Sequence, residues 1–272
     1  MWSLEPVLAK LSYSSADFVQ TTAVRTVLIL MIGSVYGVVT ARDHLTIRLS
    51  QFKILVIIGL IGGLFADLLF YYSLIRVPVI NAALISHLQP VFIVLMAFFI
   101  LKEDRLNGFD YLGIIVMMLA ALLVTTRTPV NLLNLRLGSR EDGLLLGATI
   151  GWSVAAVLVR KYMRAMNSGV LIFYRFLIPG VCLWGYLAVI GKLPVPNRFQ
   201  LWLGLVIGVG CVFYYEGIKR IKAAQVSALE LSTPFFASVL GYSVLNESVT
   251  PLQIFGMTLL LPGIYCLSRR EK

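Results

Sequence analysis

The chain has 272 residues, of which 59% are hydrophobic and only 13% are charged, and its mean hydropathy is +0.88. A soluble domain carries about 25% charged residues, so this composition excludes a globular protein with a fully water-facing surface. The net charge of +10 does not indicate nucleic-acid binding, because the basic residues form short clusters between apolar stretches instead of one long basic face.

Nine apolar stretches are long enough to be membrane-spanning helices, each of which needs about 20 residues. Runs broken by charge, Gly, Pro or Asn place them at 18–40, 54–75, 79–101, 108–126, 143–163, 169–190, 200–218, 224–245 and 252–267. The first residues, MWSLEPVLAKL, are apolar but would extend only about 16 Å as a helix, which is half of a span. The sequence therefore predicts an all-α membrane protein.

The basic residues are divided unequally between the two sets of loops. One set contains 14 Lys and Arg residues and the other contains 7. Because cytoplasmic loops carry the excess of Lys and Arg, the sequence predicts a multi-pass protein of the cytoplasmic membrane with a cytoplasmic C-terminus. No predicted loop exceeds about 16 residues, which leaves no room for a soluble domain between the spans.

The two halves of the sequence repeat each other. An offset of 150 residues, which changes to 144 after the second span, aligns Trp2 with Trp152, Arg25 with Arg175, Tyr71 with Tyr215, Pro90 with Pro234 and Glu103 with Glu247. We predict a first repeat at 1–127, a connecting loop at 128–140 and a second repeat at 141–272. Five spans is an odd number, so the second repeat is expected to have inverted orientation, which is typical of secondary transporters.

The alignment of the repeats also exposes a difference at their first helices. Ten residues, Asp142 to Gly151, precede Trp152, whereas Met1 alone precedes Trp2. We therefore expect the first helix to lack its cytoplasmic half. A misassigned start or a shortened chain is favoured over a naturally short helix, and the bundle is expected to have ten helices with the first one incomplete.

Motifs that occur once in each repeat point to a known family. Each half begins with W-S-x-x-x-V-L-x-[KR], and each carries a P-x(12)-E pattern, from Pro90 and from Pro234, followed by a glycine. Over essentially the whole chain the sequence resembles the EamA-type drug/metabolite transporter superfamily. The resemblance implies ten helices with both termini in the cytoplasm. It also implies transport, frequently export, of small metabolites or drugs, without defining one substrate.

Ionisable residues within the predicted spans are candidates for a substrate or proton pathway, because each costs about 2.5–3.5 kcal/mol to insert. Four lie roughly 9–14 Å below the outer surface and two roughly 9–11 Å above the inner one. The outer group is Glu5, Arg25, Asp67 and His87, and the inner group is Arg175 and Glu230. For the carboxylates, a role in coupling and an ion pair with the nearby arginine both remain open. For the histidine, protonation and neutral packing remain open.

Two prolines interrupt the predicted helices at equivalent positions of the repeats. Pro234 leaves the carbonyl group of Glu230 without its helical partner, and Pro90 does the same for Ser86. Interrupted helices at matched positions of two repeats indicate a binding site near the membrane midplane. The aromatic residues near these levels either line a path or anchor helices at the interface. They are Trp2, Tyr71, Tyr72, Trp152, Tyr214 and Tyr215.

The leading functional hypothesis is a secondary carrier for a small molecule that works by alternating access, either coupled to protons or as facilitated exchange. A nucleotide-binding loop is absent from the sequence, and so are zinc-protease and other intramembrane enzyme motifs. An intramembrane enzyme and a non-transporting scaffold or subunit are the alternatives. The three cysteines form no C-x-x-C pair, and no cofactor or metal site is indicated. A monomer suffices for this function, and the sequence does not define the oligomeric state.

Overall fold

The chain folds as an all-α membrane protein. A computed structural model describes residues 1–40, 46–96, 108–134, 138–163, 165–220 and 232–268. These residues form helices joined by short connections, and the described part of the chain contains no β-strand. Large apolar side chains stay exposed along the helices, as expected where the bundle faces lipid tails instead of water.

The described part of the first repeat contains two long unbroken helices, and its other helices are short or form spans divided into segments. They are α1 (Leu4–Ser12), α2 (Phe18–Thr40), α3 (Leu49–Ile58), the π-helical segment η1 (Gly59–Phe65), α4 (Ala66–Ser73), α5 (Val79–Ser86), α6 (Gln89–Met96) and α7 (Gly108–Thr126). The segments α3, η1 and α4 follow one another without a gap, so they form one span from Leu49 to Ser73.

A short helix, α8 (Pro129–Leu133), connects the two repeats. The second repeat then contains α9 (Arg140–Tyr162), α10 (Ser168–Val189), α11 (Arg198–Arg220), α13 (Ser232–Leu245) and α14 (Pro251–Ser268). Within the described residues, five helices are long and apolar enough to cross a membrane, and they begin at Phe18, Leu49, Arg140, Ser168 and Arg198. The other apolar helices that the structure describes are shorter.

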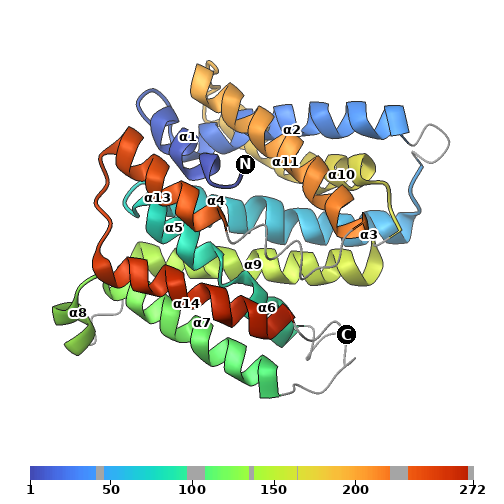
Figure 1. Cartoon of the computed structure of the whole chain (residues 1–272). Helices are drawn as coiled ribbons and strands as arrows, with labels where there is room; N and C mark the ends of the chain where they lie inside the picture. The colour runs from blue at the N-terminus through green and yellow to red at the C-terminus, as the bar shows by residue number, and fades with distance from the viewer. Residues whose placement is uncertain (41–45, 97–107, 135–137, 164, 221–231, 269–272) are drawn as a thin grey trace.

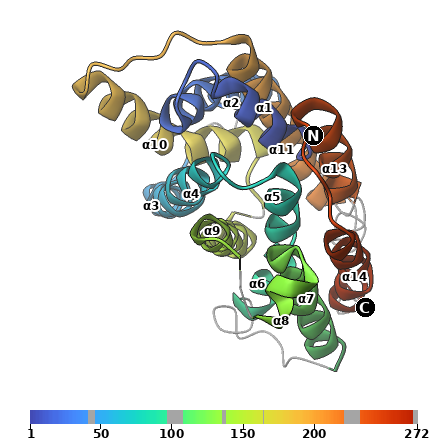
Figure 2. The same ribbon diagram turned by 90° about the vertical axis from the view of Figure 1, so that its left-hand side faces the viewer.

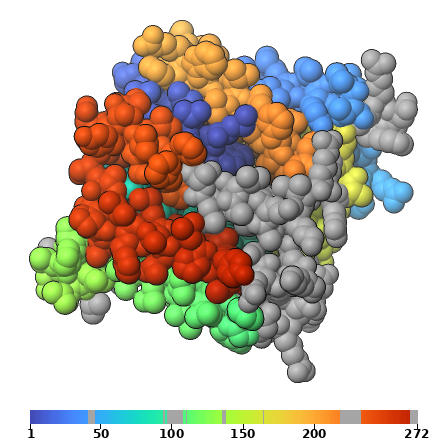
Figure 3. Space-filling view, viewed as in Figure 1, coloured from blue at the N-terminus to red at the C-terminus, as the bar shows by residue number. Residues whose placement is uncertain are grey.

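Helices from the two repeats are mixed in the bundle. The pairs that pack most extensively are α2 with α10 and α7 with α14, and α2 also packs against α11. Figure 1 shows α7 and α14 side by side along one edge, while α1, α2, α10 and α11 lie at the opposite edge. Figure 2 shows α9 end-on between α4 and α6, two helices that it contacts. On the face drawn in Figure 3, α13 and α14 cover much of the surface.

Glycines in η1 let this segment approach α10 closely. A Cβ atom at Gly59 would lie 2.9 Å from the carbonyl oxygen of Arg175, and one at Gly63 would lie 2.8 Å from Cγ of Pro179. Side chains at these positions would therefore push the two helices apart, and small residues at such crossings are typical of membrane helices. The close approach brings the middle of the η1 span against the middle of α10.

The predicted span 79–101 differs most from the observed structure, because it is divided where Pro90 lies. The helix α5 ends at Ser86, a short turn contains His87 and Leu88, and α6 begins at Gln89. Proline removes a backbone donor and clashes with the carbonyl group four residues earlier, which is the physical reason for the division. In the second repeat, Pro234 lies in the first turn of α13, and the residues just before that helix are outside the described part of the chain.

Candidate functional site

Arg25 is the centre of a polar cluster inside the apolar bundle. It lies on α2, and only 2% of its surface is exposed. Its guanidinium group forms an ion pair and a hydrogen bond with Asp67 at the start of α4. The guanidinium Nη1 atom lies 3.8 Å from Oε1 of Glu5 on α1. Three helices of the first repeat therefore contribute charged groups to one place, for which the sequence indicated a matched depth and, as one of two alternatives, an ion pair with Arg25.

Tyr71 links Glu5 to Arg25. The Tyr71 hydroxyl group donates a hydrogen bond of 2.7 Å to Oε1 of Glu5. The guanidinium carbon of Arg25 lies 4.5 Å from the centre of the Tyr71 ring, a distance at which a cation is attracted to the ring face. Tyr13 in turn donates a 2.6 Å hydrogen bond to the backbone carbonyl of Tyr71. The Glu5 carboxylate is thus held by one hydrogen bond and by the nearby positive charge.

Trp152 joins this cluster to the second repeat. Its indole Nε1–H on α9 lies 2.8 Å from Oδ1 of Asp67 and 3.1 Å from the carbonyl oxygen of Gly62. Gly62 belongs to η1, and π-helical segments occur frequently at functional sites. Both carboxylate oxygens of Asp67 therefore have partners, one from each repeat, so Asp67 is held more firmly than Glu5.

Arg175 on α10 occupies the equivalent position in the second repeat but has different surroundings. Its Nη1 donates a hydrogen bond to the hydroxyl group of Tyr215 on α11. The guanidinium carbon lies 5.4 Å from the centre of the Phe176 ring, and Nη2 lies 3.6 Å from the place that a Cβ atom at Gly62 would occupy. Within the described part of the chain, no carboxylate lies within ion-pair distance of Arg175.

The alignment of the repeats explains why the two arginines differ. Tyr71 and Tyr215 are equivalent, and both contact the arginine of their own repeat. The position of Asp67 is occupied in the second repeat by Cys211, and the position of Glu5 is occupied by Ala155. Both acidic residues around Arg25 are therefore replaced by neutral residues around Arg175.

A second polar contact lies between α1 and the loop after α13. The Nζ atom of Lys10 lies 2.8 Å from Oε1 of Glu247, and Oε2 of Glu247 accepts a 2.7 Å hydrogen bond from the backbone N–H of Val79. Glu247 therefore caps the N-terminus of α5, where an anion is stabilised by free N–H groups. The sequence aligned Glu247 with Glu103 of the first repeat, but it gave no indication of the partner Lys10.

The same end of the bundle contains a buried group of polar residues that sequence reasoning missed. Gln253 on α14 donates to the side chain of Asn81 on α5. The Asn81 amide is 3.3 Å from Oδ1 of Asp142 on α9, and Asp142 lies 3.8 Å from Arg127. The amide side chains of Asn81 and Gln253 inside predicted spans could have indicated this group. These contacts connect three helices and leave the Arg25 cluster as the more central group.

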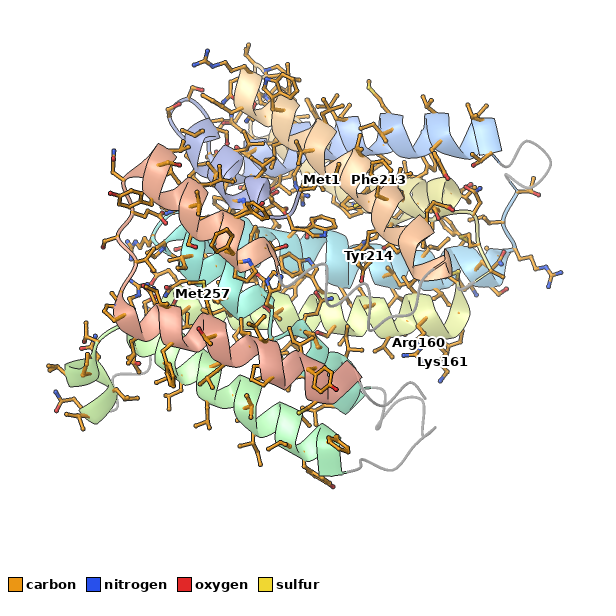
Figure 4. All side chains as sticks on the ribbon, in the orientation of Figure 1. Met1, Arg160, Lys161, Phe213, Tyr214 and Met257 are labelled. Atoms are coloured by element: carbon orange, nitrogen blue, oxygen red, sulfur yellow. The ribbon has the colours of Figure 1, made fainter. Side chains whose placement is uncertain are left out.

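The other predicted residues are not gathered at this cluster. His87 lies in the turn between α5 and α6, where its Nδ1 is 2.6 Å from the carbonyl oxygen of Ala83. Trp2 packs edge-on against Tyr214 at the contact of α1 with α11. Tyr214 is labelled in Figure 4. Tyr72 is 42% exposed and packs against Phe18. Glu230 lies outside the described residues, so its predicted pairing with Arg175 and its site role stay predictions.

The described residues contain no group of three or more His, Cys, Asp or Glu side chains that could hold a metal ion. The ionisable side chains of the Arg25 cluster can bind charged groups and exchange protons. The fold and this cluster together define a polytopic helical membrane protein with ionisable groups placed within its bundle. Such groups within spans are typical of transport proteins.

The chain belongs to the EamA-like transporter family, which matches residues 1–126 and 140–269. An uncharacterized transporter of Methanothermobacter thermautotrophicus is 26% identical over 227 residues, which are 81% of this chain and 66% of that protein. The chain therefore spans about two thirds of the length of this relative. The pseudopaline exporter CntI of Pseudomonas aeruginosa is 22% identical over 260 residues, covering 92% of this chain and 84% of the exporter.

Two further similarities agree with this assignment. Protein LicB of Haemophilus influenzae is 26% identical over 219 residues, which are 76% of this chain and 72% of LicB. A protein of known crystal structure superimposes with a TM-score of 0.70 over 100% of this chain and 94% of its own, at 18% identity. At this identity the likeness shows the fold alone. The predictions of an all-α membrane protein and of the EamA family are confirmed.

Proposed function

We propose that this protein is a secondary carrier that exports a small metabolite or drug across the cytoplasmic membrane by alternating access, in exchange for protons. The observation that supports this proposal is the cluster of Glu5, Arg25 and Asp67, which lies among apolar helices and is bound to the second repeat by Trp152. Ionisable groups in such a place mark substrate and ion pathways. The direction agrees with the name of the Pseudomonas relative, an exporter.

Glu5 is the carboxylate that we assign to proton exchange. Asp67 has a partner on each of its oxygens, whereas Glu5 has a single hydrogen bond from Tyr71 and lies 3.8 Å from Arg25. A loosely held carboxylate can take up a proton at a smaller cost than one in a tight ion pair. In the proposed cycle, Glu5 binds a proton from one side of the membrane and releases it when the substrate binds from the other.

The two repeats supply the means of alternating access. Inverted repeats can present one site to either side of the membrane, because the two arrangements of the halves are nearly equivalent. We place the C-terminus in the cytoplasm on the basis of the excess of Lys and Arg in one set of loops. This orientation puts Glu5 and Arg25 in the outer half of the membrane and Arg175 in the inner half.

The test requires a substrate, which a thermal-shift screen of metabolites against the purified full chain would identify. We would then measure substrate-dependent proton release in detergent and counterflow in proteoliposomes for the parent and for Glu5→Gln. We expect proton release to fall at least about tenfold in Glu5→Gln, because the amide does not ionise, while counterflow continues. Glu141→Gln is the matched control, since Glu141 lies at the start of α9 and pairs there with the exposed side chain of Arg76.

Two results would contradict the proposal. If Glu5→Gln releases protons as the parent does, Glu5 does not couple protons to transport. If the parent exchanges no metabolite in proteoliposomes but co-purifies stably with another membrane protein, the chain is a subunit or scaffold and not a carrier.

A further inference from the structure

Arg175 carries a positive charge that the described part of the chain does not neutralise. Among the described residues its guanidinium group donates to Tyr215 alone, and its Nε atom is buried without a partner. Arginine stays protonated under all ordinary conditions. A charge held largely away from water with no carboxylate at ion-pair distance is costly, so an anion that binds here would gain the close interaction that Asp67 supplies to Arg25 in the first repeat.

Two hydrogen-bond donors meet at this position. Arg175 donates to the oxygen of the Tyr215 hydroxyl group, which leaves the hydroxyl proton available to an acceptor. Among the described residues this proton has no acceptor, and four of the five guanidinium N–H groups have none. A ligand oxygen with negative charge would accept from both side chains. Hydrogen bonds of this kind, with a charged donor and a charged acceptor, are roughly twice as strong as neutral ones.

The exposure of the two arginines differs in the direction that a binding role requires. Arg25 is almost fully buried with its carboxylates, whereas Arg175 is partly exposed and Tyr215 and Cys211 beside it are buried. The Gly62 position against Nη2 of Arg175 has no side chain. The neutral Cys211 therefore leaves the charge of Arg175 accessible to a ligand, whereas an aspartate at this position would form an ion pair with it.

We propose that Arg175 and Tyr215 form a subsite for an oxyanion, a carboxylate or a phosphate, on the molecule that this protein transports. This proposal rests on the carrier function proposed above and adds the chemical class of one end of the substrate. The corresponding position in the first repeat cannot bind an anion in this way, because Asp67 and Glu5 already occupy Arg25.

Replacement of Cys211 by aspartate is the sharpest test, because it copies the first repeat into the second. In Cys211→Asp the new carboxylate is placed to pair with Arg175 as Asp67 pairs with Arg25, so the subsite would be filled from within. Cys211→Asn is the matched control, since it adds a side chain of the same size without the charge. Arg175→Gln removes the cation and provides a second, independent variant.

Equilibrium binding to the purified full chain is measured by thermal shift and by calorimetry, in detergent and at constant ionic strength. The probes are benzoate for the carboxylate class, inorganic phosphate for the phosphate class, and chloride and tetramethylammonium as controls. We expect one of the two oxyanions to stabilise the parent more than chloride does. We expect at least about a tenfold loss of its affinity in Cys211→Asp and Arg175→Gln, and less than about a threefold change in Cys211→Asn.

Each outcome separates this inference from the proposed function. A preference for benzoate or for phosphate assigns the carboxylate or the phosphate class. Equal affinity for oxyanion and chloride, or affinity that is unchanged in both Cys211→Asp and Arg175→Gln, overturns the subsite. Binding that depends on Arg175, in a protein that exchanges no substrate in proteoliposomes, supports the subsite and contradicts the carrier function. Exchange that is unaffected by both variants supports the carrier and overturns the subsite.

Discussion

Arg25 and Arg175 occupy the same position in the two repeats, but among the described residues only Arg25 has carboxylates at ion-pair distance. Around Arg25 the sequence supplies Glu5 and Asp67, and the side chain is almost fully buried. Around Arg175 the equivalent residues are Ala155 and Cys211. The comparison shows that two equivalent helices can both keep an arginine while its neighbours differ. In one repeat the arginine forms an internal ion pair, and in the other its described neighbours are neutral.

The difference also shows where each repeat is expected to be sensitive to mutation. In the first repeat, removal of a carboxylate leaves a buried charge without its partner, so stability should suffer. In the second repeat, no carboxylate of the described chain is there to remove, so changes beside Arg175 should affect ligand binding more than folding. The following predictions test this difference, beginning with the largest expected effect.

The largest effect is expected for Asp67→Asn. The amide keeps the shape of the side chain but leaves Arg25 with Glu5 alone at 3.8 Å. Removal of one partner from a buried pair typically costs about 3–5 kcal/mol, so we expect a marked fall in the melting temperature in detergent. Cys211→Ser at the equivalent position is the control, with an expected change below about 1 kcal/mol. Equal losses in the two variants would contradict the proposed difference between the repeats.

A smaller effect is expected for Trp152→Phe. Phenylalanine fills most of the same space but cannot donate to Asp67 or to the Gly62 carbonyl group. We expect a loss of about 1–3 kcal/mol, the typical cost of leaving buried acceptors without a partner. Trp2→Phe provides the comparison in the first repeat, because Trp2 contributes a ring contact with Tyr214. If unfolding in detergent shows the same loss for both variants, the indole N–H is not what binds the repeats together.

The smallest effect is expected at the ion pair between Lys10 and Glu247. A double-mutant cycle with Lys10→Met and Glu247→Gln should give a coupling energy of about 1 kcal/mol, since the pair is mostly buried and 2.8 Å apart. The pair between Arg76 and Glu141 is the matched control, because Arg76 is 74% exposed. Its coupling should be below about 0.5 kcal/mol, as for other surface pairs. A larger coupling at the exposed pair would show that burial does not decide the difference.

Hydropathy and repetition predicted most of the fold, because both follow from the order of residues along the chain. The bilayer requires long apolar helices, so their presence and approximate limits can be read directly from the sequence. The division of the span 79–101 could be predicted in part, since Pro90 cannot continue the backbone hydrogen bonds. The π-helical segment could not be predicted, because the glycines of GLIGGLF indicate close packing but not a hydrogen-bond pattern, which depends on the contact with α10.

The candidate site was less accessible to prediction, because its contacts depend on how the helices are rotated. A matched depth predicted that Arg25 and its carboxylates are neighbours, but not that Trp152 reaches Asp67 from the other repeat. Tyr71 and Tyr72 are adjacent in sequence, yet one contacts Glu5 and the other packs against Phe18 on an exposed face. Hydropathy cannot separate such neighbours, since a rotation of about 100° between them decides which one faces the interior.

The division between α5 and α6 has a mechanical consequence. The segment α5 is fixed at its first residue by Glu247 and along its length by the contact of Asn81 with Gln253. The segment α6 follows after the short turn at His87 and Leu88. Both segments are also held against α9, where Thr149 donates to the carbonyl oxygen of Ile85 and Ser153 donates to that of Gln89. The hydroxyl groups of α9 therefore span the break and oppose bending at the turn.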